Sequence, residues 1–392
     1  MRQKNSRTLV YLISMGAFAL GMASYVTAGL VPLIEESFSI PAAMAAQLVT
    51  AFTLAYGIGS PLVVAVLPAG RQREGLLWAL ALFVLANAAS ALADNMTALL
   101  IFRALAGIGA GVYLATAISA AAALSEANAR GKSIAVLMGG MASGAVLGVP
   151  LSLVVADLAG WPSALWLIAG LGLIAFIGIW VKLPPVLPAA AAVSMRRKLS
   201  ILRDRNVSAI LLVSFLAAIA SLGMYTFMAP FMMISLHAHS IVPWLWLWGV
   251  GGILGSVLVG SIANRISGPA LTLGIMSILT LSLLAMPIMA RWNIWLMTIP
   301  VMLWGAVGWA LQVPQNHQLI LAREHTGDGN LAVALNESAL YLGSAAGASA
   351  GGLILSFNLD VFLLPIIAAG VAFIGMLIQL GIGKKSAPDP LY

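Results

Sequence analysis

The chain has 392 residues, of which 61% are hydrophobic and only 8% are charged. A water-soluble protein of this length needs more polar surface, so the composition excludes a soluble globular fold. With no cysteine, disulfides and thiolate metal or redox sites are excluded as well. The net charge of +7 does not indicate nucleic acid, because the basic residues lie between apolar runs, where cytoplasmic loops and an anionic leaflet account for them.

Apolar runs long enough to cross a bilayer recur along the whole chain. A spanning helix needs about 20 apolar residues. Twelve runs meet this requirement, at about 9–31, 44–68, 75–93, 97–124, 133–156, 162–183, 208–236, 243–264, 269–290, 294–321, 331–357 and 361–383. Alternating strands of a membrane barrel are absent, so the sequence predicts an all-α membrane protein with twelve transmembrane helices.

Nearly all of the 19 Lys and Arg residues fall in seven short segments that separate successive pairs of runs. The positive-inside rule therefore places both termini in the cytoplasm and predicts a multi-pass protein of the cell membrane, in a bacterium the inner membrane. The one long connection, 184–207, begins with prolines and ends in basic residues. We expect it to be a cytoplasmic linker between two six-helix bundles, residues 1–183 and 208–392.

The two halves share a pattern of glycines. Glycines spaced by four residues occur in the fifth run and again in the eleventh, at Gly140, Gly144, Gly148, Gly343, Gly347 and Gly351. Such glycines let helix backbones approach closely, so packing is their expected role. A duplication in which both halves keep one orientation predicts two pseudo-symmetric bundles and transport by rocking one half against the other.

Five short motifs carry a family resemblance. They are residues 29–32 (GLVP), 47–52 (QLVTAF), 57–62 (GIGSPL), 103–111 (RALAGIGAG) and the glycines of 140–148 followed by Pro150. In these the chain resembles the major facilitator superfamily over essentially its whole length, closest by pattern to the drug/proton antiporter branch with its sugar and arabinose efflux-like members. The resemblance implies the major facilitator fold, a monomer and a central cavity. Residues 336–352 fit the eleventh span of that branch, which makes Asn336 a cavity candidate.

Two departures from the family pattern concern gating and coupling. Arg71, Arg73 and Arg265 keep the basic part of the family's loop motif, but its aspartate is absent. Many relatives have an acid in the middle of the first span, where this chain has Ser24, Tyr25 and Val26. The usual position of the proton carrier is therefore empty.

Three residues remain as candidates for proton coupling. Glu337 is the only carboxylate well inside an apolar run, and ionisable residues at such places mark ion pathways, although Glu337 is near enough to the cytoplasmic end to reach water. His317 follows Pro314 in a polar end of the tenth run, which either lines water or has reached the headgroups. Asp157 lies near the outer end of the fifth run, where a solvated helix end is the favoured interpretation.

Four further residues are substrate-cavity candidates. Arg103 lies inside the fourth run, where it either anchors a substrate or bonds to backbone carbonyls. Tyr25 and Tyr225 have similar depths in the first and seventh runs, and Gln312 could bond a polar ligand. The tryptophans at 244, 246 and 248 are expected to form an interfacial aromatic belt.

The motifs exclude enzymatic chemistry. No hydrolase elbow, zinc-protease motif or phosphate-binding loop occurs, so we expect no enzyme, no ATP use and no cofactor except the coupling proton. No metal site is expected either. The sequence predicts an exporter of small neutral or amphiphilic organic solutes, such as drugs or sugars, by proton antiport with alternating access. The alternative is an uncoupled facilitator of a small polar metabolite.

Overall fold

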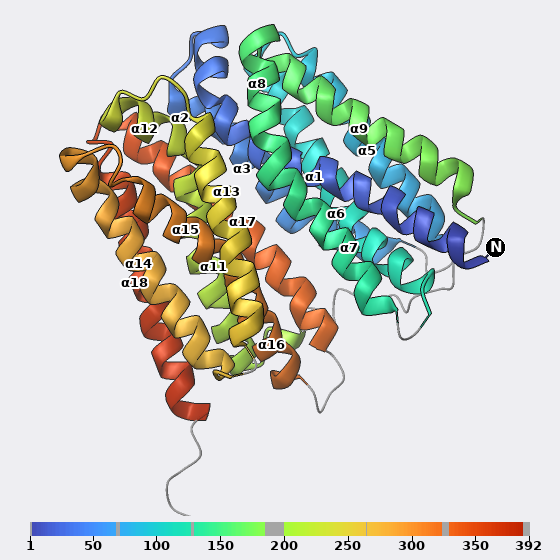
Figure 1. Ribbon diagram of the computed structural model, residues 1–392. Coiled ribbons are helices and arrows are strands. Elements are labelled where there is room, and N and C mark those ends of the chain that lie inside the picture. The colour runs from blue at the N-terminus through green and yellow to red at the C-terminus, as the bar shows by residue number, and fades with distance from the viewer. Residues whose placement is uncertain are drawn as a thin grey trace, which may run out of the picture. The chain divides into compact units, whose positions relative to one another are not determined.

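The computed structural model describes residues 2–67, 71–126, 129–184, 200–263, 265–323 and 329–386 (Figure 1). These residues form helices and no strand, as expected for an all-α membrane protein. Eleven helical segments are long and apolar enough to cross a membrane. Of the twelve expected spans, only the tenth, at 294–321, is missing from these eleven. It consists of two helices, α15 (Thr298–Ala310) of 13 residues and α16 (Gln312–Ala322) of 11 residues, each too short to be counted alone.

Contacts within the chain divide it into two compact units, Met1–Met195 and Arg196–Tyr392. The division lies in the expected linker at 184–207, of which residues 185–199 lie outside the described residues. Gly70 and Asn264 of the two loop motifs lie outside them too. Each unit is treated separately below.

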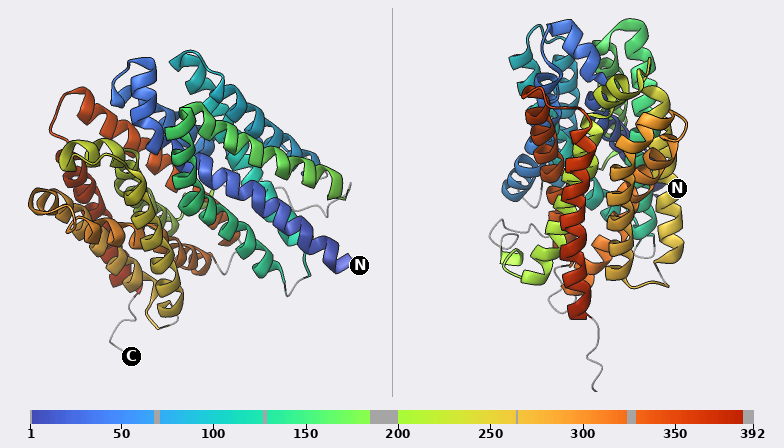
Figure 2. Two further views of the ribbon diagram at one scale, coloured as in Figure 1. Left: turned by 45° about the horizontal axis from the view of Figure 1, so that its top comes forward. Right: turned by 90° about the vertical axis from the view of Figure 1, so that its left-hand side faces the viewer.

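In the first unit, α1 is the central helix. It lies beside α7 and α9, while α5 packs on α6, and Figure 2 shows the green α9 running along the dark-blue α1. The elements are α1 (Arg2–Phe38), α2 (Ala42–Ala45), α3 (Gln47–Leu54), the π-helical turn η1 (Ala55–Gly59), α4 (Ser60–Val66), α5 (Gln72–Ala91), α6 (Met96–Ala123), α7 (Arg130–Ser143), the π-helical turn η2 (Gly144–Gly148), α8 (Val149–Ala159) and α9 (Trp161–Lys182).

In the second unit, α11 packs on α17 and α18, and α13 packs on α15. Besides α15 and α16, the elements are α11 (Arg205–Thr226), α12 (Met228–Leu236), α13 (Val242–Ile262), α14 (Gly268–Trp292), α17 (Gly329–Ser356) and α18 (Leu363–Ser386). The expected seventh span, 208–236, is therefore two helices, α11 and α12, that meet at Phe227.

Prolines explain both interruptions in the second unit. A proline has no N–H and leaves the carbonyl four residues before it without its helical partner. Helix α11 ends at Thr226, four residues before Pro230, and α15 ends at Ala310, four residues before Pro314. The missing N–H of Pro314 thus accounts for the place where α15 ends and α16 begins.

The same rule applies to the two π-helical turns of the first unit. The carbonyl four residues before Pro61 lies in η1, and the one four residues before Pro150 lies in η2. A π-turn is a common way to absorb a lost helical bond without ending the helix. Pro32 and Pro287 lie inside α1 and α14, which continue without a break, so a proline alone does not decide the outcome.

The glycines spaced by four residues make equivalent contacts in the two units. A Cβ on Gly144 would overlap the carbonyl oxygen of Phe18 in α1, and a Cβ on Gly347 would lie 2.5 Å from the carbonyl oxygen of Ile219 in α11. Gly140 and Gly148 likewise face α1, while Gly343 faces α11 and Gly351 faces the side chain of Phe227 just after α11. The glycines spaced by four thus bring one pair of helix backbones into contact in each unit, α1 with α7 and η2 and α11 with α17.

Candidate functional site

Four aromatic side chains form a cluster in the second unit. Trp248 of α13 lies at its centre, with its ring centroid 4.6 Å from Tyr225 of α11, 6.0 Å from Trp304 and 5.9 Å from Trp309, both of α15. The indole N–H of Trp304 donates to Ser221 Oγ at 2.8 Å, which fixes that ring. Trp309 is half-buried, whereas the other three rings are buried. We call these four residues the aromatic cluster.

The aromatic cluster lies next to both helix interruptions. Tyr225 directly precedes the last residue of α11, and Trp309 directly precedes the last residue of α15. At Phe227 the backbone leaves helical geometry, with φ −105° and ψ 13°, whereas Leu311 keeps helical dihedrals, with φ −59° and ψ −33°. Irregular backbone at membrane depth is stable where it is buried in protein or lines a cavity, and transporters commonly bind substrates at broken helices such as the one at Phe227. Aromatic rings offer apolar surface and an electron-rich face to amphiphilic or cationic ligands.

The interfacial aromatic belt predicted at positions 244, 246 and 248 is largely wrong. Trp244 and Trp248 are 7% and 2% exposed, and only Trp246, at 39%, has the exposure of a belt residue. Glycines explain the difference, because Gly305 lets α15 approach the backbone of Trp248 so closely that the indole is enclosed between helices. The spacing of the tryptophans alone did not reveal this packing.

The polar end of the tenth span divides into two faces on α16. Gln312 is half-buried and His317 is exposed, whereas Gln315 and Gln318 are 0% and 6% exposed. His317 therefore lies on the outside of the helix, as expected if the helix has reached the headgroups. The sequence analysis did not single out Gln315 and Gln318, although both lie in the polar run that it identified.

Asn336 and Glu337 are neighbours on α17. Asn336 is fully buried, and its Nδ2 donates to Asn316 Oδ1 of α16 at 2.9 Å. Glu337 is partly buried and lies about 12 Å along α17 from its first residue, at 1.5 Å per residue. Among the described residues, its carboxylate has no hydrogen bond and no ion pair. Asn336 thus joins two helices, while Glu337 keeps an uncompensated carboxylate.

Arg103 is held by three other helices of the first unit. Its side chain is 1% exposed; Nη2 donates to the carbonyl oxygen of Ala23 at 2.8 Å, and Nη1 donates to Asn87 Oδ1 at 3.3 Å. The guanidinium carbon lies 4.5 Å from the centroid of the Phe52 ring. These contacts agree with the backbone-bonded hypothesis, not with a substrate anchor. Asn87, a lone amide in an apolar run, was a signal that the sequence analysis missed.

The remaining coupling and cavity candidates of the first unit are not gathered at one site. Tyr25 is half-buried on α1. Asp157 is exposed near the end of α8, as expected for a solvated helix end. Tyr25 and Tyr225 belong to different units, so their predicted opposition across a cavity stays a prediction.

The arginines of the loop motifs make local contacts. Arg73 donates from Nη2 to the carbonyl oxygen of Trp180 at 3.1 Å and from Nε to that of Leu183 at 3.3 Å, so it caps the end of α9. Arg71 forms an exposed ion pair of 3.7 Å with Glu74, and Arg265 is exposed. The contacts of Arg73 are those of a helix cap, and gating by these arginines stays a prediction.

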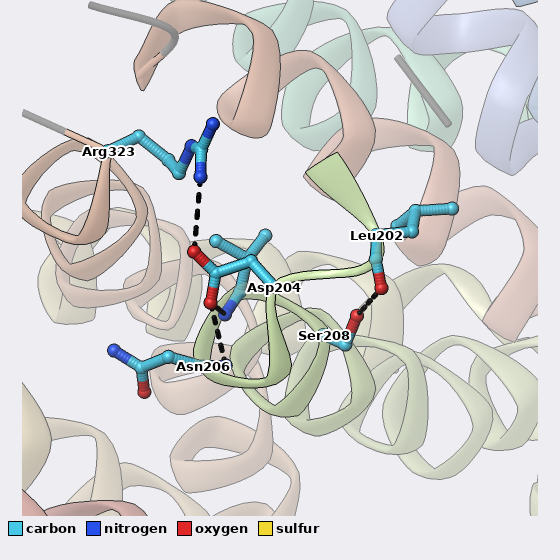
Figure 3. A network of polar contacts seen from close by, with 6 residues as sticks. Leu202, Asp204, Asn206, Ser208 and Arg323 are labelled. Carbon is cyan, nitrogen blue, oxygen red and sulfur yellow. Dashed lines mark hydrogen bonds and ion pairs between the residues drawn. The ribbon is translucent and has the colours of Figure 1, made fainter. Parts of the chain in front are cut away.

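An ion pair joins two helix ends of the second unit (Figure 3). Asp204 caps α11 by accepting hydrogen bonds from the backbone N–H groups of Asn206 and Val207, and its second oxygen lies 3.1 Å from Arg323 Nη1 after the end of α16. Ser208 donates to the carbonyl oxygen of Leu202 at 2.6 Å beside it. The aspartate before an apolar run is a recognisable N-cap signal, but its partner 119 positions away is not.

A family model described as Major Facilitator Superfamily matches residues 13–329. The inner membrane transport protein YdhP of Escherichia coli (strain K12) is 29% identical, with 95% of each chain covered. A chloramphenicol resistance protein of Streptomyces lividans is 28% identical, with 86% of each covered. In fold, the chain resembles a bacterial homolog of the human lysosomal transporter Spinster, with a TM-score of 0.68, 15% identity, and coverage of 97% of this chain and 98% of that one.

Proposed function

The chain belongs to the Major Facilitator Superfamily, and from this premise we propose that it exports small amphiphilic organic solutes in exchange for protons. Membership makes it a multi-pass membrane transporter. The direction of transport, the solute class and the coupling ion belong to the proposal. The relative named for chloramphenicol resistance supports export of a small organic compound. Transport would use alternating access between the two six-helix halves.

Glu337 is the observation that carries proton coupling. It is a carboxylate in a membrane-spanning helix, with no ion pair or hydrogen bond among the described residues. An ionised carboxylate in a span is costly unless it is paired or hydrated, so an unpaired one is suited to bind a proton in one access state and release it in the other. Its location on α17 explains how coupling can occur without an acid in the first span.

The aromatic cluster supports an amphiphilic solute. Its four rings come from three helices and lie next to both interruptions of the second unit, at Phe227 and Leu311. An apolar surface with few polar groups is typical of sites for drug-sized molecules. Sugars need many hydrogen-bond partners, and this cluster offers one phenol hydroxyl and indole N–H groups, of which that of Trp304 is already bonded to Ser221. The proposal therefore favours a flat or cationic organic solute over a sugar.

One observation favours the alternative, an uncoupled facilitator. The first span has Ser24, Tyr25 and Val26 where relatives have an acid, and Asp157, the other carboxylate considered for coupling, is exposed at a helix end. If Glu337 did not exchange protons, the other carboxylates of the described spans would all be ones at helix ends. The same experiment decides between the two functions.

The test uses purified protein in liposomes with a pH-sensitive dye inside and compounds from an efflux screen as solutes. Glu337→Gln keeps the shape of the side chain and removes its charge. We expect it to stop uphill, pH-driven efflux while ligand binding and downhill exchange continue. Asp157→Asn is the matched control and should transport like the wild type.

Three outcomes would contradict the proposal. Unchanged uphill efflux by Glu337→Gln would remove Glu337 from coupling. Solute flux by the wild type without any proton flux would establish the facilitator instead. Loss of function in Asp157→Asn alone would move coupling to the first unit.

A further inference from the structure

One turn of α16 places three amides inside the second unit. Gln315 is fully buried, Gln318 is 6% exposed, and Asn316 between them bonds to Asn336 of α17. Leu319, on the same buried face as Gln315, is fully buried and apolar, so this part of the bundle accepts an alkyl side chain. Solvent exposure therefore does not explain why glutamines stand at positions 315 and 318.

The hydrogen bonds of these amides join four helices. Gln318 Nε2 donates to Thr272 Oγ1 of α14 at 2.8 Å and to the carbonyl oxygen of Pro314 at 3.3 Å. Gln379 Nε2 of α18 donates to Gln318 Oε1 at 3.4 Å and to the carbonyl oxygen of Pro269 at 3.3 Å. Together with the Asn316 to Asn336 bond, they connect α14, α16, α17 and α18.

Four buried atoms of this cluster have no protein partner among the described residues. They are Gln315 Nε2, Gln315 Oε1, Asn336 Oδ1 and Gln379 Oε1. A buried amide without a partner is less favourable than an alkyl group of the same shape, so such atoms call for a bonding partner. Gln315 is the strongest case, because it needs both an acceptor and a donor. Water supplies both and commonly satisfies buried polar groups.

The cluster extends from one end of the unit toward Glu337. Counting 1.5 Å per residue, Gln318 lies about 6 Å and Gln315 about 10 Å from the last residue of α16, the end assigned to the cytoplasm. Asn336 lies about 10 Å into α17 from the corresponding end and directly precedes Glu337. These polar side chains thus lie about 6 to 10 Å from this end, and the carboxylate lies at about 12 Å.

We propose that Gln315, Gln318, Asn336 and Gln379 line a hydrated inlet within the second unit, through which protons pass between the cytoplasmic side and Glu337. The inlet rests on the proposed function. Amides suit this role, because they orient water by donating and accepting hydrogen bonds but hold no proton themselves.

Few charged groups could compete with Glu337 for that proton. Among the described side chains of α11, α16 and α18, the helices packed against α17, they are His317 and Arg323 at α16 and Asp204 and Arg205 at the start of α11; Lys384 and Lys385 at the end of α18 lie outside the described side chains. Asp204 and Arg323 pair with each other, and His317 is exposed. None of the four has a hydrogen bond or ion pair with Glu337. The carboxylate is therefore the proton-binding group at the inner end of the inlet.

Silver ions in water test hydration without any assumption about coupling. The chain has no cysteine, so Gln315→Cys introduces a single thiol at the inlet, and Leu319→Cys introduces one at an equally buried apolar position of the same helix. After exposure to silver, the unfolded protein is labelled with a maleimide that counts the unreacted thiols. We expect Gln315→Cys to react at least about tenfold faster than Leu319→Cys, because thiolate forms where water reaches it. Equal reaction of the two thiols would overturn the inlet.

Transport tests whether the inlet carries the coupling proton. Gln315→Leu, or Gln315→Met if the first variant does not accumulate, should slow pH-driven uphill efflux several-fold and leave ligand binding and downhill exchange unchanged. Leu319→Met is the control and should not slow it. Unchanged efflux with a raised unfolding temperature would show a dry core amide and overturn the proposal. Efflux driven by a sodium gradient instead of a pH gradient would overturn the assignment to protons.

The two experiments separate this inference from the proposed function. A wild type that shows no proton coupling defeats the proposed function and the proton path, whatever the silver result. Fast reaction of Gln315→Cys with silver in such a protein would still establish a hydrated inlet, but one that does not carry coupling protons. Proton coupling through Glu337 combined with an inert Gln315→Cys thiol would defeat the inlet alone.

Discussion

Replacing Arg103 by alanine should destabilise the first unit. The substitution removes hydrogen bonds to the Ala23 carbonyl and Asn87 Oδ1, at 2.8 and 3.3 Å, and the contact with the Phe52 ring. Hydrogen bonds to a charged group contribute about 1.5–3 kcal/mol each and the ring contact about 0.5–2 kcal/mol. Removing a buried guanidinium also relieves about 2.5–3.5 kcal/mol of its cost in a membrane. The free energy of unfolding should therefore fall by about 3 kcal/mol, with bounds of about 0 and 5.5 kcal/mol.

Tryptophan fluorescence during heating in detergent measures this effect, since the protein has 11 tryptophans. Arg103→Lys keeps the charge but reaches fewer acceptors, so its unfolding temperature should lie between those of the wild type and Arg103→Ala. With Asn87→Ala and the double variant, a cycle should give a coupling of about 0.5–3 kcal/mol. Arg265→Ala, at an exposed arginine, is the control without effect.

One result would refute this reasoning. If Arg103→Ala unfolded at the wild-type temperature and lost only transport, the guanidinium would serve the solute path and not the packing of the bundle. Contacts other than those of Arg103 would then hold α1, α3, α5 and α6 together.

The remaining predictions concern packing and a helix cap. Gly347→Ala should lower the unfolding temperature, because the new Cβ would lie 2.7 Å from the Cα of Gly223. Gly370→Ala has open space around it and should raise the unfolding temperature slightly. Equal effects of the two substitutions would contradict the helix contact. Asp204→Ala should cost about 1 kcal/mol through the lost N-cap, while Asp204→Asn should cost less, because it keeps the cap and loses only the ion pair with Arg323. An Asn variant as unstable as the Ala variant would show that the ion pair dominates.

Much of the fold followed from local signals. Apolar runs and basic loops predicted the spanning segments, because both reflect the bilayer directly. The interruption at Leu311 followed from Pro314, which removes a backbone donor wherever it lies in a helix. The break at Phe227 and the uninterrupted helices around Pro32 and Pro287 did not follow, because whether a helix continues past a proline depends on neighbouring helices.

The site was less predictable, because its partners are far apart in the sequence. Arg103 could be recognised as buried, but its acceptor is the backbone carbonyl of Ala23, which no residue type reveals. The polar run after Gln312 was visible, yet the sequence could not say that Gln315 faces inward and His317 outward. In a helix surrounded by lipid and protein, hydrophobicity does not distinguish the two faces as it does in a soluble protein.

The distribution of charge in the two units limits where coupling can occur. The six carboxylates of the first unit all lie at helix ends or in turns, at Glu35, Glu36, Glu74, Asp94, Glu126 and Asp157. Its one deeply buried charged group, Arg103, stays protonated and is already bonded. Among the described residues, only the second unit has a carboxylate inside a span and away from the helix ends, at Glu337. If this transporter moves protons, we therefore expect the exchange to take place in the second unit.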